Sequence, residues 1–134
     1  TKAPETDYAD QYSAREAKKL ADRGVRVSIG AHGQEEGLGS HWELWSFVRG
    51  GRTPLEALRA GTITSAQHLG FDRDIGSLEA GKLADLVILN ANPLADIRNS
   101  DKIDRVMVNG RLYDAATMNE VVTGTRKRTP YYWE

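Results

Sequence analysis

At 134 residues, the chain is long enough for one domain with a modest core, or for a piece of a larger one. Its 18 Lys and Arg side chains nearly balance 19 Asp and Glu side chains, and the formal net charge of -1 offers no field that would attract nucleic acid or an anionic membrane. Cysteine is absent, which excludes disulfides, thiolate metal ligands and cysteine nucleophiles, so a metal would need nitrogen or oxygen ligands.

Neither a membrane span nor a signal peptide is predicted. No apolar run approaches the roughly 20 residues that cross a bilayer, and the first six residues lack the apolar centre of a signal peptide. We therefore expect a soluble chain. The composition leaves its compartment open between the cytoplasm and an exported location.

Helices are predicted for much of the first half of the chain. Ser40, with Glu43 three residues later, predicts a capping box at a helix start. Thr53 before Pro54 predicts a second start, with proline at the first helical position. The predicted helices cover residues 8–23, 41–49, 54–60 and 62–69, and the first has Tyr12, Ala17, Leu20 and Ala21 near one side.

Strands are predicted after the first helix and again in the second half of the chain. Residues 25–29 alternate apolar and polar side chains, and residues 75–78 and 84–89 flank a turn in which Gly81 would take a positive φ. Because residues 84–89 are nearly all apolar, both faces of that strand are expected to be covered. Asn109-Gly110 predicts a tight hairpin between residues 106–108 and 111–113.

The loop of residues 30–39 is the candidate site. It contains four glycines and follows a predicted strand, which is where α/β proteins place their chemistry. The imidazole of His32 could bind a metal through one nitrogen, or accept a proton from water near neutral pH, since its ordinary pKa is about 6.5. A structural hydrogen bond is the alternative role. Gln34 and Glu36 are candidate substrate contacts, with solvated loop residues as the alternative.

The other two histidines and two of the tryptophans are interpreted as structural. His41 lies at a helix start and His68 in a last helical turn, where a cation suits the helix dipole. Trp42 and Trp45 are expected to pack the helix against its neighbours, with the wall of a pocket as the alternative.

The runs TPLEALRAGT (residues 53–62) and IGSLEAGKLADLVIL (residues 75–89) resemble the C-terminal signature of the amidohydrolase superfamily, particularly its imidazolonepropionase-like and prolidase-like members. The resemblance covers about residues 25–113. It implies the α/β class: the C-terminal fragment of a (β/α)8 barrel, which when complete takes about 250 residues, plus part of a small β-sandwich. Residues 1–73 would supply the eighth strand and last helices, residues 74–119 the sandwich segment, and residues 120–134 a tail.

The resemblance also implies a function. Such enzymes hydrolyse C–N bonds of amides, cyclic amides or dipeptides by a metal-activated water, and an aspartate that follows the eighth strand contacts the metal and handles the proton of that water. His32 occupies the corresponding position here, which makes it the candidate catalytic residue and metal ligand. Zinc or another divalent metal is expected in the complete enzyme, with no metal in this chain as the alternative.

The expected partners follow from the same resemblance. They are a small amide or peptide substrate and either the remainder of the barrel or further copies of the chain; neither nucleic acid nor a membrane is expected. The alternative function is a catalytically inactive remnant or a self-assembling structural fragment. A nucleic-acid module ranks last, because clustered basic charge is confined to residues 126–128 of the tail.

Overall fold

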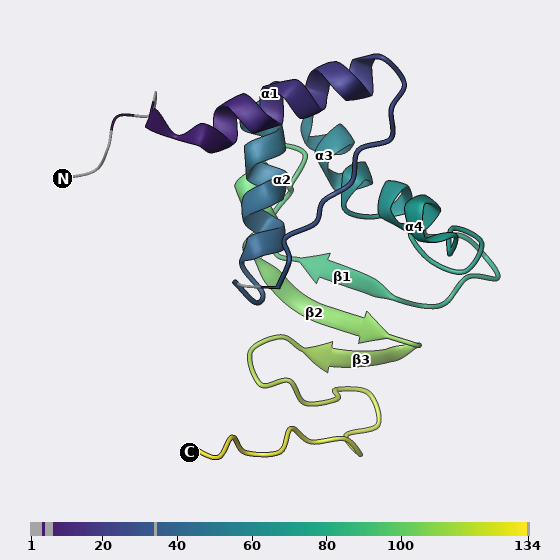
Figure 1. The fold of residues 1–134 in the computed structure, drawn as a ribbon. Helices are drawn as coiled ribbons and strands as arrows, with labels where there is room; N and C mark the ends of the chain where they lie inside the picture. Colours follow the sequence, from purple (N-terminus) through teal and green to yellow (C-terminus); the bar gives the residue numbers. More distant parts are fainter. Residues whose placement is uncertain (1–3, 5–6, 34, 134) are drawn as a thin grey trace.

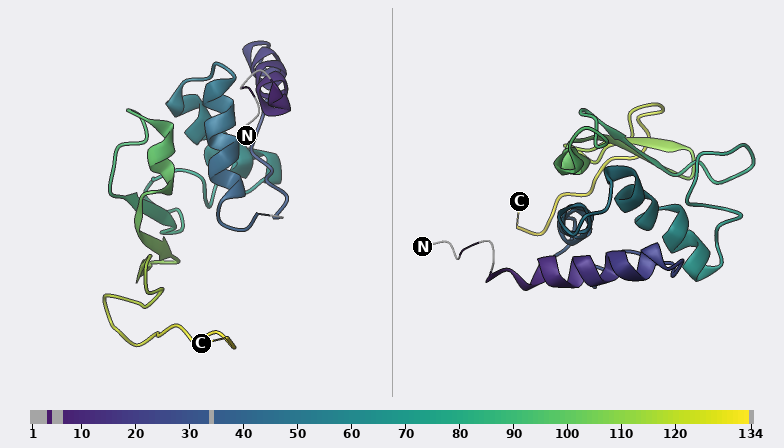
Figure 2. Two further views of the ribbon diagram at one scale, coloured as in Figure 1. Left: turned by 90° about the vertical axis from the view of Figure 1, so that its left-hand side faces the viewer. Right: turned by 90° about the horizontal axis from the view of Figure 1, so that it is seen from above.

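The computed structural model describes residues 4, 7–33 and 35–133. Helix α1 forms one layer, helices α2 to α4 form the next, and a three-stranded antiparallel sheet lies beyond them, as the view from above shows (Figures 1 and 2). The tail continues past the sheet, away from the helices (Figure 1). In chain order the elements are α1 (Ala9–Asp22), α2 (Gly39–Arg49), α3 (Pro54–Ala60), α4 (Ile63–Leu69), β1 (Leu86–Leu89), the 3-10 helix η2 (Ile97–Asp101), β2 (Ile103–Val108) and β3 (Arg111–Asp114).

Helix α1 is confirmed, but its predicted buried side is partly wrong. Ala14 is buried, whereas Tyr12 and Leu20 are 60% and 47% exposed. The reason is the way that α2 meets α1. A Cβ added at Gly50, the C-cap of α2, would lie only 2.5 Å from the Cβ of Ala14, so the two helices touch through small residues. The larger apolar side chains of α1 remain outside this contact.

The two predicted caps have opposite outcomes. The Thr53 hydroxyl accepts from the Glu56 backbone N–H at 3.2 Å and the Glu56 carboxylate accepts from the Thr53 N–H at 2.7 Å, which confirms this start. The bond from the Thr53 N–H, together with one that the Thr53 hydroxyl donates to the same carboxylate at 2.9 Å, lowers the pKa of Glu56. The Ser40 capping box is wrong: α2 begins at Gly39, whose N–H already donates to the Glu35 carbonyl at 2.8 Å, so Ser40 lies inside the helix.

The hairpin is confirmed, and so is the short helix that ends at Gly70. Asn109 and Gly110 take φ angles of 48° and 77°, the left-handed pair that a two-residue turn of the primed type requires. β2 and β3 pair antiparallel on either side of this turn, with Val106 opposite Tyr113. Helix α4 ends at Gly70, which is also left-handed at φ 75°.

Two strand predictions are wrong, and a third is right about the strand but wrong about its surroundings. Residues 25–29 are extended but pair with no strand in the described part of the chain, since a strand exists only where a neighbouring strand supplies its hydrogen bonds. Residues 75–77 form bends and residue 78 is irregular, because Gly76 packs so tightly on α4 that an added Cβ would lie 2.7 Å from that of Ala66. The strand near residues 84–89 is present as β1, but its faces are not both covered: Val87 is 54% exposed, since the helices lie on one side of the sheet only (Figure 2).

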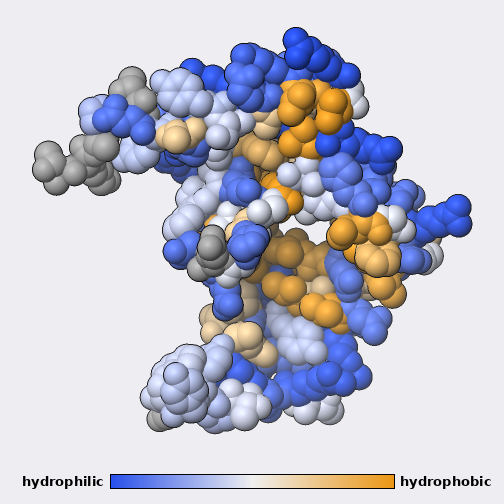
Figure 3. Space-filling view, viewed as in Figure 1, coloured by the Kyte–Doolittle hydropathy of each residue, from blue (hydrophilic) through white to orange (hydrophobic). Residues whose placement is uncertain are grey.

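The core is small and centres on α2. Leu44, Ala57 and Ile97 are buried, with Trp45 and Phe47 packed against them. Across the described residues, no large side chain is fully buried, and apolar side chains reach the surface between the helices and the sheet (Figure 3). The described part therefore leaves much of its apolar surface available to a neighbour.

The tail is held by a buried carboxylate rather than by regular structure. Glu120, 3% exposed, bridges to Tyr113 of β3 and accepts hydrogen bonds from the residues that wrap around it. These donors are the Thr123 hydroxyl at 2.6 Å, the Thr125 hydroxyl at 2.9 Å, the Arg126 N–H at 3.2 Å and the Arg111 guanidinium at 3.3 Å. The hydroxyl bonds are the main reason that the pKa of Glu120 falls to about 2. The covering is local, because the tail lies far from the helical core (Figure 1).

None of the helices in the described ranges is long and apolar enough to cross a bilayer.

Candidate functional site

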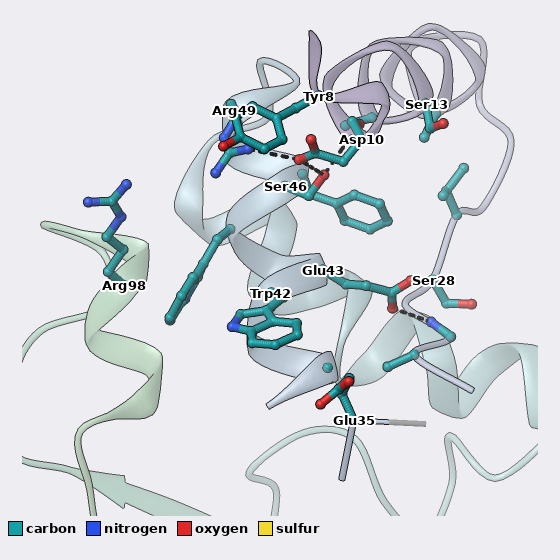
Figure 4. Close-up of a pocket in the computed structure, with 18 residues that line it drawn as sticks. Tyr8, Asp10, Ser13, Ser28, Glu35, Trp42, Glu43, Ser46, Arg49 and Arg98 are labelled. Atoms are coloured by element: carbon teal, nitrogen blue, oxygen red, sulfur yellow. Dashed lines mark hydrogen bonds and ion pairs between the residues drawn. The ribbon is translucent and has the colours of Figure 1, made fainter. Parts of the chain in front are cut away.

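The loop that carries the predicted site is anchored at its base. The Gly30 N–H donates to the Glu43 carboxylate of α2 at 2.6 Å, a contact that Figure 4 shows between helix and loop. Gly39, the first residue of α2, lies so close to Ala31 that an added Cβ would be 3.1 Å from the Ala31 Cβ. The Glu35 carbonyl accepts from the Gly39 N–H, which makes the last turn of the loop helical. Both ends of the loop therefore rest on the start of α2.

His32 lies at the turn of this loop in an uncommon backbone conformation. Its φ is 60°, and that of Gly33 is 77°, so the chain is left-handed at two successive residues. Residues other than glycine seldom adopt this region, although histidine does so more readily than most. The imidazole is exposed. A left-handed histidine on a short, anchored loop is a feature that functional sites accumulate.

The described contacts do not bring His32 and Glu36 together. Glu36 is exposed on the same loop. Gln34 lies outside the described residues. The roles assigned to these residues remain predictions.

The described residues do not fit a metal on their own. Nowhere in the described ranges do three or more His, Asp or Glu side chains come together as a group that could hold an ion. Zinc sites use three or four protein ligands, so His32 could supply one nitrogen ligand at most to a site completed by other residues.

A hollow of about 1180 Å³ opens beside the loop, between α1, residues 27–31 and α2. Its walls are rich in aromatic and small side chains, and Figure 4 shows the α2 side chains that point into it. His32 and Glu36 are outside this lining. The hollow is lined by Tyr8, Asp10, Ser13, Ala14, Ala17, Val27, Ser28, Gly30, Ala31, Glu35, Gly39, Trp42, Glu43, Trp45, Ser46, Phe47, Arg49 and Arg98.

One ion pair closes the α1 end of the hollow. The Asp10 carboxylate accepts from the Arg49 guanidinium at 2.9 Å and from the Ser46 hydroxyl at 3.2 Å, and so ties α1 to α2 (Figure 4). Sequence reasoning missed this group and the Gly30–Glu43 contact. The sequence predicts only a capping role for Glu43. No sequence signal pairs Asp10 with Arg49, because these residues meet only when the two helices pack.

The other two histidines each contact one serine. His41 Nδ1 lies 3.0 Å from the Ser100 hydroxyl, which also accepts from the Trp45 indole N–H at 3.0 Å, and this links α2 to η2. His68 Nδ1 lies 2.7 Å from the Ser28 hydroxyl and so links α4 to the extended segment before the loop. These contacts join elements that are distant in sequence, which is consistent with structural roles.

Comparison with known proteins places the chain in a family. The sequence model of the amidohydrolase family matches residues 11–113, which include the loop, helices α1 to α4 except the first two residues of α1, and the three-stranded sheet except the last residue of β3. The chain belongs to the amidohydrolase family. The resemblance read from the two sequence runs is thereby confirmed.

Individual relatives point the same way. An imidazolonepropionase of Geobacillus kaustophilus is 37% identical over 92 residues, which are 65% of this chain and 22% of that protein. A 5-methylthioadenosine/S-adenosylhomocysteine deaminase of Moorella thermoacetica is 30% identical over 133 residues, covering 81% of this amidohydrolase chain and 31% of the relative. A Xaa-Pro dipeptidase crystallised with methionine in its active site superimposes with a TM-score of 0.70 at 30% identity, over 76% of this chain and 25% of the other. The chain thus spans less than a third of each of these relatives.

Proposed function

We propose that this chain forms the C-terminal part of a hydrolase of C–N bonds in amides, cyclic amides or dipeptides. The observation that supports the proposal best is the position of His32, on an anchored loop that directly follows an extended segment and directly precedes helices matched to the family. A loop after a barrel strand is where this architecture carries its chemistry. The relatives include hydrolases and a deaminase, which favours this reaction class.

Residues 25–29 would act as the eighth strand of a barrel whose other strands come from residues outside this chain. The hollow supports this assignment, because it lies along residues 27–31 and is walled by Trp42, Trp45 and Phe47. A neighbouring parallel strand would lie about 4.8 Å from the extended segment, would pair with its backbone and would cover these aromatic side chains. The hollow is then a docking face for strands, and substrate would bind at the loop instead.

The sheet would belong to the second, smaller unit. β1 lies at the edge of the sheet with Val87 and Ile88 54% and 38% exposed, which suits pairing and packing with further strands. The (β/α)8 barrel and β-sandwich organisation therefore remains our proposal for the complete protein.

His32 would act as the proton acceptor for the attacking water or as one ligand of a zinc or other divalent metal. The described residues offer no complete metal site, so the other ligands would have to come from the rest of the barrel. Glu36 and Gln34, on the same loop, would contact a small amide or peptide substrate.

The test uses the full natural polypeptide that contains this chain. We expect it to hydrolyse at least one substrate from a panel of Xaa-Pro dipeptides, cyclic amides and N-substituted ureas, and to carry metal measurable by mass spectrometry. His32→Ala should lower kcat/KM by about 100-fold or more, the usual loss for a general base. The matched control is His68→Ala, which removes another imidazole of the same half of the chain, and which should retain wild-type kcat/KM to within about threefold.

Another result would favour the alternative of a catalytically inactive remnant or self-assembling fragment. In that case the natural polypeptide would be no longer than this chain, would hydrolyse nothing on the panel and would elute as an oligomer, with a second copy covering the hollow. Light scattering combined with intact mass separates the two functions.

A further inference from the structure

A carboxylate of α2 holds the first amide of the loop that carries His32. Glu43 lies on the first turns of the helix, and its half-buried side chain points back along the helix toward the loop (Figure 4). Its carboxylate accepts the Gly30 N–H at 2.6 Å, across 13 residues of sequence. An ionised acceptor makes this a charge-assisted hydrogen bond, which is shorter and stronger than a bond between neutral groups.

Among the described residues, few other contacts restrain the chain just before His32, apart from the packing of Ala31 on Gly39. Before it, the Ile29 N–H donates to the Ala60 carbonyl at 3.3 Å, a long bond. A Cβ added at Gly30 would meet nothing within 4 Å, so packing does not restrain this residue. Glycine at that position leaves the backbone free to rotate. The Gly30–Glu43 bond is therefore the contact that orients the peptide two residues ahead of the imidazole.

We infer that Glu43 is a positioning residue for His32. By fixing the Gly30 peptide, it sets the direction in which the chain enters the left-handed turn at His32 and Gly33, and hence the side of the loop from which the imidazole projects. The helix start does not need this side chain, because α2 begins four residues earlier without a side-chain cap. The consequence for catalysis rests on the proposed function, whereas the consequence for the loop does not.

Two variants separate the hydrogen bond from the charge. Glu43→Gln keeps a carbonyl oxygen that can accept the Gly30 N–H, and Glu43→Leu removes the acceptor but keeps much of the volume. The matched control is Glu36→Gln, which neutralises an exposed carboxylate of the same loop. In 15N-labelled chain, we expect Glu43→Leu to reduce protection of the Gly30 amide from hydrogen exchange by at least about tenfold, a change of about 1.4 kcal/mol in opening. The amide signals of residues 30–33 should move while those of the β2–β3 hairpin stay in place.

Glu43→Gln and Glu36→Gln should both leave the Gly30–His32 signals close to those of the parent. Unchanged Gly30 protection in Glu43→Leu would overturn the inference. So would equal loss in the Gln and Leu variants, since that would assign the effect to charge rather than to the hydrogen bond.

A measurement on the parent chain keeps the inference testable even where Glu43→Leu fails to fold. Gly30 is exposed, so its amide should exchange quickly with solvent unless it donates a hydrogen bond. We expect the Gly30 amide of the parent chain to be protected from exchange by at least about tenfold relative to an unstructured peptide. An unprotected Gly30 amide in the parent chain refutes the assignment.

Activity of the full natural polypeptide supplies the last readout. Glu43→Leu should lower kcat with little change in KM, and Glu43→Gln should restore at least half of the parent kcat. A polypeptide that is inactive before any substitution would refute the proposed function, yet the exchange results would still decide the role of Glu43.

Discussion

Gly50→Ala tests the packing of α1 on α2, the contact that frames the hollow. An added Cβ would lie 2.5 Å from the Ala14 Cβ and 2.6 Å from its carbonyl carbon. Carbon atoms in contact prefer about 3.5–4.0 Å, so α1 would have to move away by about 1 Å. Overpacking of this kind costs about 1–3 kcal/mol, and alanine returns up to about 1 kcal/mol through its lower backbone entropy. We expect a net loss of about 1–2 kcal/mol.

Urea unfolding followed by circular dichroism measures this loss as a shift of the midpoint. The matched control is Gly30→Ala, since an added Cβ there meets nothing within 4 Å, and it should change the free energy of unfolding by less than about 0.5 kcal/mol. Ala14→Gly in the same chain should rescue Gly50→Ala only in part, because the carbonyl carbon and oxygen of residue 14 remain 2.6 and 2.8 Å away. A Gly50→Ala protein as stable as the parent would show that the helices do not cross this closely.

Two further predictions concern the helix cap and the tail. Thr53→Ala removes the hydroxyl of the capping box and should lower the free energy of unfolding by about 1 kcal/mol, measured by urea unfolding, with Thr129→Ala in the exposed tail as the control. The tail should respond to acid. Since folding lowers the pKa of Glu120 to about 2 from 4.5, its contribution is fully present above about pH 4.5 and is lost as the pH falls toward 2. Fluorescence of Trp133 should report this loss, and Glu120→Gln should remove it; a signal with the same pH dependence in Glu120→Gln would contradict the role of this carboxylate.

Much of the local structure could be predicted because its causes lie within a few residues. Thr53-Pro54 fixes a helix start through hydrogen bonds to residues of the next turn. Asn109-Gly110 fixes the hairpin because both residues accept left-handed angles. These signals do not depend on what else surrounds the chain, so they survive in any context.

The errors share a different cause: each depended on a partner elsewhere in the chain or outside it. Residues 25–29 have the composition of a strand, yet a strand needs a neighbour. Residues 84–89 have the composition of a strand covered on both faces, yet β1 lies at a sheet edge with Val87 exposed. In both cases the pattern indicates the composition of a strand, but the neighbours that such a strand needs are not supplied by the described residues.

The same distinction between local causes and distant partners applies to the candidate site. His32 could be predicted as a candidate from its place in a glycine-rich loop after an alternating apolar and polar segment, and from the resemblance to the family. Glu43 could not, because its carboxylate had two available partners, the start of its own helix and the Gly30 amide, and only the packing of loop on helix decides between them.

The partner that the Glu43 carboxylate takes connects the fold to the proposed chemistry. Had Glu43 capped α2, the helix would have gained one hydrogen bond at its start and the loop would have lost its anchor. Instead α2 starts without a side-chain cap, and the carboxylate stabilises the backbone that leads to His32. Helices α1 and α4 also start without a side-chain cap bond, so the missing cap of α2 is not by itself a sign of function. What distinguishes α2 is that the carboxylate of Glu43 holds the backbone of the loop that carries the left-handed His32. The fold and the proposed chemistry meet at this one hydrogen bond.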